Sequence, residues 1–446
     1  MQTEILIIGA GAAGLATAVE LSKAGRSVVV IEARDRIGGR MLTQHESKSN
    51  HPIELGAEFI HGRSPVLFSI IEQAKLKVAE VSSRNWYYEG GHFVKSGEFW
   101  ASVENVMHRM KREIKDATFK SFVDSVPVNE ASDTAKSLAL RFVEGFHAAD
   151  VNKVGIQGLV AIDEDEAETD GDRTFRLVNG YSGLIAYLFD EAEVHGTKFL
   201  LNTAASEIGW QERRVEIRTT SGVTIAATKA VVTLPLSLLK LNQSSPGAVN
   251  FVPSLPQNKL DAINAIEMGP ALRIVLRFND SFWQHMRLPG DSHQDLKHIG
   301  FLNYPDAPLP TWWTTLPEDN PMMVGWAGGP TAARLLDLKE NEIEAKAIRS
   351  LALILGVDDH DLRSHLSRTY FHNWSTDPFS KGAYAYLPVN GVQHQLTLAK
   401  PIANTLFFAG EATSLGEIGT VHGAIKSGQR AAREVLATDP AQLISR

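Results

Sequence analysis

Short, uninterrupted runs of apolar residues lie near both ends of the chain, and such runs are typical of strands buried on both faces of a sheet. Residues 4–8 and 27–32 form two of these runs, with a predicted helix over residues 12–23 between them. Strand, helix and strand in this order predict a βαβ unit that opens a doubly wound sheet. Residues 406–409 repeat the buried-strand pattern, and a closing helix is predicted over residues 420–436.

Between these ends, helical and extended patterns alternate. Residues 101–147 are predicted to be helical because apolar residues recur at helical spacing. The positions that carry this spacing are Val103, Val106, Met107, Met110 and Ile114. Further helices are predicted over residues 186–193 and 342–355, and strands over residues 214–219, 229–233, 272–278 and 322–326. The alternation indicates domains that are interleaved in sequence.

Composition narrows the classes of function. The 446 residues are 43% hydrophobic and 22% charged, as in soluble globular proteins of two or three domains. The formal net charge of −8 argues against nucleic acid as a partner, because phosphate binding needs a basic surface. No run of 18 apolar residues predicts a membrane span, and residues 5–19 lack the basic start of a signal peptide, so a cytoplasmic location is expected. No HExxH or EF-hand spacing predicts a metal site.

Three glycines follow the spacing of a dinucleotide-binding turn. Gly9 permits the tight turn from strand to helix, Gly11 lets the backbone approach a pyrophosphate, and Gly14 allows close packing of helix on strand. The helix start then stabilises phosphate charge. Glu32 ends the second strand, where its carboxylate can accept hydrogen bonds from ribose hydroxyls. Together these features predict a dinucleotide site, but they do not separate NAD from FAD.

The segment that follows resembles the flavin amine oxidase family, which includes monoamine oxidases, polyamine oxidases and lysine-specific histone demethylases. It reads Glu32-Ala33-Arg34-Asp35-Arg36-Ile37-Gly38-Gly39-Arg40. Six further blocks resemble the family in the same order, at residues 54–62, 201–205, 231–236, 374–379, 382–384 and 407–424. The resemblance implies FAD as the cofactor. The FAD is expected to be bound non-covalently because no cysteine is available for a thioether link. Among the members, a bacterial-type polyamine oxidase is the nearest match.

The resemblance also implies roles in cofactor binding. Arg40 would approach the FAD pyrophosphate, Ala205 the adenine, Glu411 the ribityl–pyrophosphate region, and Thr420 with Val421 the pyrimidine edge of the flavin. Block 54–62 would run beside the isoalloxazine ring. The expected cofactor contacts are Gly9, Gly11, Ala12, Ala13, Gly14, Glu32, Ala33, Arg34, Gly39, Arg40, Gly56, Ala57, Glu58, Ala205, Trp374, Gly410, Glu411, Thr420 and Val421.

On the substrate side, Tyr384 matches one wall of the aromatic cage that family members build over the flavin. The opposite wall falls at Thr420, where monoamine oxidases carry a second tyrosine and some polyamine oxidases a small hydroxyl residue. Trp374 would pack near the ring. His61 matches a histidine of several polyamine oxidases and would lie with Glu58 along the substrate channel. Ordinary core packing remains the alternative for the aromatic residues, and a structural role the alternative for His61.

Arg273 departs from the family pattern, which places a lysine here to hold a water on flavin N5. An arginine in a protein does not lose its proton, so Arg273 cannot act as a base. If it points at the flavin, it would orient water, stabilise the reduced anionic flavin and favour dehydrogenase over oxidase behaviour. The alternative is that Arg273 pairs with a carboxylate elsewhere.

The implied reaction is oxidation of an amine C–N bond. The neutral amine would deliver hydride to flavin N5, and the imine would hydrolyse to an aldehyde and an amine, with O2 or another electron acceptor reoxidising the flavin. A polyamine such as spermidine or spermine is favoured because of Thr420, His61 and seven carboxylates over residues 163–172, although such a run is more often a solvated loop. The alternatives are an L-amino-acid oxidase, with Arg63 or Arg273 clamping the carboxylate, and an FAD-binding interaction protein with little turnover.

These expectations combine into an α/β fold with two interleaved domains. A Rossmann-like FAD-binding domain is predicted over residues 1–80, 174–269 and 393–446. An α+β substrate-binding domain, a mixed sheet flanked by helices, is predicted over residues 81–173 and 270–392.

Overall fold

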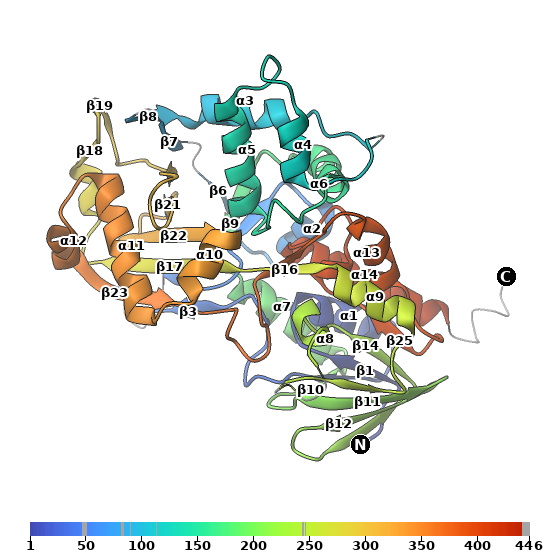
Figure 1. The fold of residues 1–446 in the computed structure, drawn as a ribbon. Coiled ribbons are helices and arrows are strands. Elements are labelled where there is room, and N and C mark those ends of the chain that lie inside the picture. Colours follow the sequence, from blue (N-terminus) through green and yellow to red (C-terminus); the bar gives the residue numbers. More distant parts are fainter. Residues whose placement is uncertain are drawn as a thin grey trace.

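A computed structural model describes residues 1–438 of the chain, except 47–50, 82–83, 90, 113, 243–244 and 246. Three groups of elements are visible in Figure 1. A sheet with helices, built from both ends of the chain, lies at the lower right, a second sheet lies at the left, and a set of helices lies across the top.

The first group is built on a five-stranded parallel sheet of order β10-β2-β1-β14-β25. Its strands are β1 (Ile5–Ile8), β2 (Val28–Ile31), β10 (Lys198–Leu200), β14 (Lys229–Val232) and β25 (Leu406–Phe408). Every residue of β1, β2, β14 and β25 is buried, which explains why these strands are apolar except for Lys229 at the start of β14. The sheet therefore joins segments that lie at opposite ends of the sequence.

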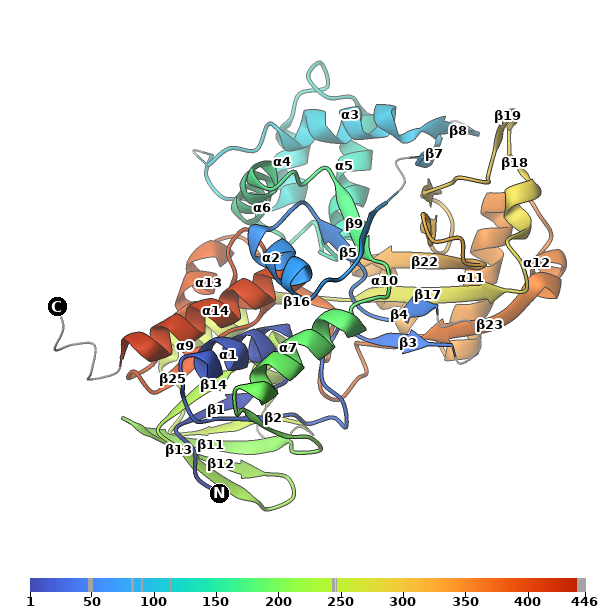
Figure 2. The ribbon, with the colours of Figure 1, turned by 180° about the vertical axis from the view of Figure 1, so that it is seen from behind.

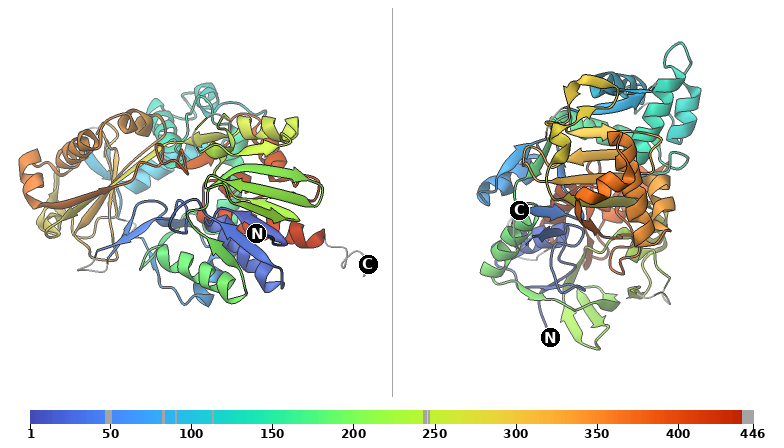
Figure 3. Two further views of the ribbon diagram at one scale, coloured as in Figure 1. Left: turned by 90° about the horizontal axis from the view of Figure 1, so that it is seen from below. Right: turned by 90° about the vertical axis from the view of Figure 1, so that its left-hand side faces the viewer.

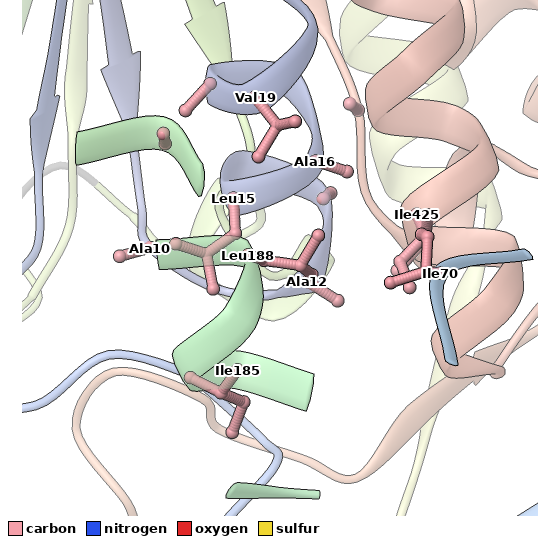
Figure 4. Packing of buried hydrophobic residues seen from close by; sticks show 14 of the residues in the cluster. Ala10, Ala12, Leu15, Ala16, Val19, Ile70, Ile185, Leu188 and Ile425 are labelled. Atoms are coloured by element: carbon pink, nitrogen blue, oxygen red, sulfur yellow. The ribbon is translucent and has the colours of Figure 1, made fainter. Parts of the chain in front are cut away.

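Helices α1 (Ala12–Lys23), α7 (Ser182–Val194) and α14 (Val421–Ala437) lie together on one face of this sheet (Figure 2). Figure 4 shows Ala12 and Val19 of α1 among Leu188 of α7, Ile425 of α14 and Ile70 of α2 (Pro65–Gln73), all in one buried cluster. Helix α14 approaches α1 so closely that a Cβ on Gly428 would lie 2.3 Å from the carbonyl oxygen of Ala13. The C-terminal helix is thereby locked onto the first helix of the chain.

The second group is a seven-stranded mixed sheet of order β23-β17-β22-β21-β20-β7-β8. Its strands are β7 (Trp86–Glu89), β8 (His92–Lys95), β17 (Ala271–Phe278), β20 (Phe301–Asn303), β21 (Thr311–Thr314), β22 (Met322–Gly328) and β23 (Leu366–Phe371). Helices α10 (Gly329–Leu336), α11 (Glu340–Leu355) and α12 (Asp359–His365) gather on one side of it (Figures 1 and 3). Leu272, Ile274 and Leu276 of β17 pack in the same cluster as α11, so the alternate position Arg273 faces the opposite side.

The third group consists of α3 (Ser96–Met107), α4 (Phe119–Ser125), α5 (Asp133–Phe146) and α6 (Ile156–Glu168). The prediction that residues 101–147 are helical is correct only in part, because helices α3, α4 and α5 are separated by segments that are not helical. Met110 follows the end of α3, and Ile114 is 38% exposed. New helices start where side chains cap them: Thr118 accepts from the Ser121 amide and Ser132 from the Ala135 amide.

Smaller sheets and helices connect these groups. One sheet contains β5 (Phe59–His61), β6 (Val78–Glu80) and β9 (Thr174–Leu177). Another contains β11 (Ala205–Gln211), β12 (Arg214–Thr219), β13 (Thr224–Ala227) and β15 (Asn250–Val252). Three two-stranded sheets pair β3 (Thr43–His45) with β4 (Pro52–Glu54), β16 (Glu267–Gly269) with β24 (Tyr384–Tyr386), and β18 (Arg287–Leu288) with β19 (Asp291–Asp295). The remaining helices are α8 (Leu236–Leu239), α9 (Gln257–Ala265) and α13 (Gly391–Ala399), with 3-10 turns at Phe282–His285 and Glu411–Thr413.

The α/β fold that the sequence predicts is present, with its parallel sheet, its mixed sheet and flanking helices. The domain boundaries remain a prediction. None of the helices in the described part of the chain is long and apolar enough to cross a membrane.

Candidate active site

One cavity of about 1800 Å³ lies where the three groups of elements meet. It exceeds the upper end of typical small-molecule pockets, about 1,000 Å³, so it has room for a dinucleotide and a second molecule. Every predicted cofactor contact except Gly14 lines it, and so do the predicted substrate-side residues His61, Glu58, Arg273, Trp374, Tyr384 and Thr420. The fold therefore brings the predicted site residues together from all parts of the chain.

The glycine turn divides its tasks between folding and binding. Gly9 has a φ of +109°, which favours glycine, and a Cβ on it would lie 2.7 Å from Thr233 Oγ1. A Cβ on Gly14 would lie 1.9 Å from the carbonyl oxygen of Gly9, so Gly14 serves helix packing and does not line the cavity. A Cβ on Gly11 would meet nothing within 4 Å. Gly11 thus leaves open backbone at the start of α1, a cradle that fits the pyrophosphate of FAD.

Glu32 and Arg34 are held in place beside this turn. The Glu32 carboxylate accepts from the amides of Ala10 at 2.8 Å and Arg34 at 2.9 Å. The Arg34 guanidinium donates to Asp377 Oδ1 at 2.5 Å and to Ser380 Oγ at 3.0 Å. Although burial raises the pKa of the Asp377 carboxyl, hydrogen bonds from His372 and Arg34 outweigh it and hold that pKa below its usual range. Arg34 lines the cavity while its charge is paired with Asp377.

Arg40 and Glu411 form an ion pair on the cavity wall. Their Nη1 and Oε1 atoms are 2.9 Å apart, and the same Nη1 donates to the carbonyl oxygen of Ala383 at 2.6 Å. Glu411 Oε2 accepts from the Gly419 amide at 3.1 Å and the Ala385 amide at 3.3 Å. The Arg40 side chain keeps 24% of its surface exposed, so its guanidinium can still meet an anionic group in the cavity.

Tyr384, Thr420 and Trp374 contribute to the walls and also hold the surrounding fold. The Tyr384 hydroxyl donates to the carbonyl oxygen of Phe146 at 2.7 Å. Thr420 Oγ1 caps α14 by accepting from the Gly423 amide at 2.9 Å. Trp374 Nε1 donates to the carbonyl oxygen of Leu55 at 2.7 Å. Each of these residues therefore packs within the fold and also lines the cavity.

Arg273 pairs with a carboxylate, but that carboxylate lies in the site. Its Nη2 is 2.6 Å from Glu58 Oε2, and its Nε donates to the carbonyl oxygen of Glu54 at 2.6 Å. The second oxygen of Glu58 lies 3.3 Å from Nη1 of Arg176, a residue that the sequence analysis missed. Although burial raises the pKa of Glu58, the charges of Arg273 and Arg176 outweigh it and lower that pKa. Arg176 lies in an ordinary strand, so no sequence signal singled it out.

Besides His108, three histidines line the cavity: His61, His147 and His422. The rings of His61 and His147 each lie 5.0 Å from the ring of Phe146. Burial lowers the pKa of each of the three to about 4, so all are neutral near pH 7. Within the described residues, no group of histidine and carboxylate side chains is placed to hold a metal ion. His147 was missed because it lies in no motif, and His422 was not singled out although it lies within the block at residues 407–424.

The charge pattern favoured a solvated loop for the acidic run, and this is wrong for residues 163–168, whereas residues 169–172 form a turn in which Asp170 and Asp172 are exposed. Residues 163–168 belong to α6, and the carboxylates Asp163, Glu164, Asp165, Glu166, Asp170 and Asp172 line the cavity. Burial raises the pKa of Asp163 to about 6 and that of Glu166 to about 7. These six residues, defined here as the acidic wall, form one side of the cavity.

The acidic wall adjoins both edges of the substrate side. A Cβ on Gly62, next to His61, would lie 2.6 Å from the Thr169 carbonyl oxygen. A Cβ on Gly416, four residues before Thr420, would lie 2.9 Å from the Asp165 Cβ. Arg63, the arginine considered for a substrate carboxylate, does not line the cavity, and its guanidinium lies 4.5 Å from the centre of the Phe68 ring. Cations are therefore better accommodated here than carboxylates.

Known proteins resemble the chain in sequence and in fold. The family model described as flavin containing amine oxidoreductase matches residues 12–436. The chain is 28% identical over 462 residues to Polyamine oxidase 4 of Oryza sativa subsp. japonica, covering 96% of this chain and 88% of that protein. It is 26% identical over 463 residues to Lysine-specific histone demethylase 2 of Homo sapiens, covering 97% of this chain and 53% of that protein. A structure of wild-type putrescine oxidase bound to putrescine superposes with a TM-score of 0.79 at 20% identity, covering 98% of this chain and 99% of that chain, which is a likeness of fold.

Proposed function

Because the chain belongs to the flavin-containing amine oxidoreductase family and is therefore an FAD-dependent amine oxidoreductase, we propose that its substrate is a polyamine such as spermidine or spermine. The acidic wall carries this proposal. A polyamine presents several ammonium groups along one flexible chain, and several carboxylates facing one cavity match that charge distribution.

Two partly buried carboxylates of the wall make no ion pair among the described residues. Glu164 pairs with Arg112 and Asp165 with Lys426, whereas Asp163 and Glu166 make no ion pair within that part of the chain. Burial raises both pKa values; His108 opposes this shift at Asp163, whereas the neighbouring carboxylates Asp163 and Asp165 add to it at Glu166. A substrate ammonium would supply a compensating charge, so these two are the proposed contacts for the distal nitrogens.

The residues around the reacting amine would favour its neutral form. Tyr384, Trp374 and Phe146 present aromatic surface to the cavity, and an apolar surrounding lowers the pKa of an ammonium from its usual value of about 10. FAD, when bound, supplies the acceptor for the hydride of the amine α-carbon. The substrate imine that results is hydrolysed to an aldehyde and a smaller amine.

Taking the amine proton near neutral pH needs a cavity group whose pKa is near 7. His61, with a pKa of about 4, is too weak a base for that task, and its neutral ring leaves the approach of a cation unopposed. Arg273 is engaged by Glu58 and the Glu54 carbonyl, which leaves it poorly placed to clamp a substrate carboxylate. This disfavours the L-amino-acid oxidase alternative.

The test is anaerobic mixing of the FAD-loaded protein with spermine, spermidine, putrescine, an aryl monoamine and L-amino acids, while the flavin absorbance is recorded. We expect bleaching with the polyamines and little with the other compounds. Bleaching by L-amino acids or by the aryl monoamine alone would overturn the substrate assignment. No bleaching with any compound would favour an interaction protein with little turnover. Admitting air afterwards separates an oxidase from a dehydrogenase.

A further inference from the structure

Two guanidinium groups share one carboxylate on the wall of the cavity. Glu58 Oε2 lies 2.6 Å from Arg273 Nη2, and Glu58 Oε1 lies 3.3 Å from Arg176 Nη1. Each of the three side chains has at most 7% of its surface exposed. Two positive charges and one negative charge leave this cluster, named here the Arg–Glu–Arg cluster, with one formal positive charge away from water.

Contacts from several strands hold the cluster in place. Trp313 Nε1 donates to Glu58 at 3.1 Å, and Arg273 Nε donates to the Glu54 carbonyl oxygen at 2.6 Å. The Arg176 guanidinium donates to the Thr314 carbonyl oxygen at 3.4 Å, while its Nε has no partner among the described residues. A charge held by this many contacts cannot swing away, so the field that it exerts on the cavity is fixed.

The acidic groups near the cluster are too few or too exposed to cancel its charge below neutral pH. Glu54 accepts from the Tyr181 amide at 2.6 Å and the Thr43 hydroxyl at 2.9 Å, and burial raises its pKa to about 7. It is therefore largely uncharged at pH 6. Glu318, the other acidic neighbour of Arg176, lies on a partly exposed loop where water screens its charge.

Only part of the cluster reaches the cavity. Glu58 and Arg273 line it together with Leu55, Gly56 and Trp374, which are residues of the blocks that resemble the flavin-binding segments of the family. Arg176 does not line it and lies behind Glu58, paired with Phe59 across the β5–β9 register. It can act on the cavity only through Glu58 and through its charge.

We propose that Arg176 is a positioning residue that fixes Glu58 and Arg273, and that the cluster places one net positive charge beside the flavin, stabilising its anionic forms. Charge placed near the flavin ring changes the free energy of adding an electron pair to it. The proposal goes beyond the choice of substrate, because it concerns the cofactor and holds whichever amine is oxidised.

The experiment measures the Kd for sulfite, from bleaching of the flavin absorbance, and the two-electron midpoint potential of the FAD-loaded protein at pH 6. No substrate is present, so failure here is distinguishable from failure of the polyamine proposal. Arg176→Gln removes the net charge, and we expect sulfite to bind about tenfold more weakly with a lower potential. Glu58→Gln leaves two positive charges, and we expect tighter sulfite binding with a higher potential. Arg176→Lys keeps the charge and should stay near wild type.

Arg173→Gln is the matched control, because it removes an arginine three positions away whose charge is paired with exposed Glu80. It should leave both readouts unchanged. Thermal melting of each variant reports whether it folds. If Arg176→Gln does not fold, Glu58→Gln and Arg176→Lys still test the proposal. A merely structural cluster would shift Arg176→Gln and Glu58→Gln in the same direction. That result, or an unchanged sulfite Kd in Glu58→Gln, would overturn the proposal.

Discussion

Gly11 and Gly14 belong to one turn, yet replacing each by alanine should have opposite consequences. Gly11 has φ −78° and ψ −176°, which any residue adopts, and its added Cβ would meet nothing within 4 Å. Gly11→Ala should therefore leave the stability of the FAD-free protein unchanged or raise it by about 0.4–1 kcal/mol. The new methyl group would stand in the open cradle at the start of α1, so FAD should bind about 30-fold more weakly, a loss of about 2 kcal/mol.

Gly14→Ala should act on folding instead. Its Cβ would lie 1.9 Å from the Gly9 carbonyl oxygen and 3.1 Å from Thr233 Oγ1, so backbone must move to admit it. Overpacking of this kind costs roughly 1–3 kcal/mol of folding free energy. The affinity for FAD would fall only to the extent that the turn itself is displaced.

Thermal melting with and without FAD measures both effects. At a concentration of 100 times the wild-type Kd, FAD should stabilise the wild type by about 2.7 kcal/mol and Gly11→Ala by only about 0.9 kcal/mol. Gly14→Ala should melt lower than wild type even without FAD. The reasoning is refuted if Gly11→Ala keeps the full stabilisation by FAD, or if it lowers the melting temperature of the FAD-free protein as far as Gly14→Ala does.

Three further predictions concern charge. Glu166→Gln should raise the KM for spermidine about tenfold. Glu168→Gln changes an exposed residue of the same helix outside the cavity and should leave the KM unchanged, so equal effects would contradict the role of the acidic wall. Arg273→Lys offers one nitrogen where two now bond, so flavin reduction and reoxidation by O2 should both change in stopped-flow traces, and unchanged rates would exclude a flavin contact. His422 has a pKa of about 4 when folded and about 6.5 when unfolded, so it contributes stability above pH 6.5 that is lost as the pH falls toward 4. The free energy of unfolding in urea should accordingly fall less steeply over this range in His422→Gln, by up to about 1.4 kcal/mol per pH unit, and an identical slope would contradict the shift.

The elements that local patterns predict are those with the simplest environments. The helix predicted over residues 12–23 and the strand over 214–219 have the predicted bounds, as α1 and β12. The central strands of the parallel sheet are buried on both faces, so apart from Lys229 in β14 their sequences are apolar whatever their neighbours are. The glycine spacing is equally local, because the turn and its contact with the helix lie within a few residues.

Two predictions were wrong in part, because a local pattern says nothing about the surroundings of a segment. Apolar periodicity ran across the end of α3, since it does not record where side chains of Thr118 and Ser132 cap new helices. Carboxylates over residues 163–172 favoured a loop in solvent, but charge does not distinguish outer surface from the wall of a cavity. In the structure, the charged C-terminal end of helix α6 lines the cavity.

The sequence by itself determined the α/β fold, the dinucleotide turn, the family and many of the residues that meet in one cavity. Tertiary structure alone decided how the charges among them are paired. Arg273, Glu58 and Arg176 lie on three segments that are far apart in the sequence. Neither spacing nor composition links them. They meet because alternate residues of a strand face opposite sides: Leu272 and Ile274 pack with α11, and Arg273 is thereby turned toward Glu58.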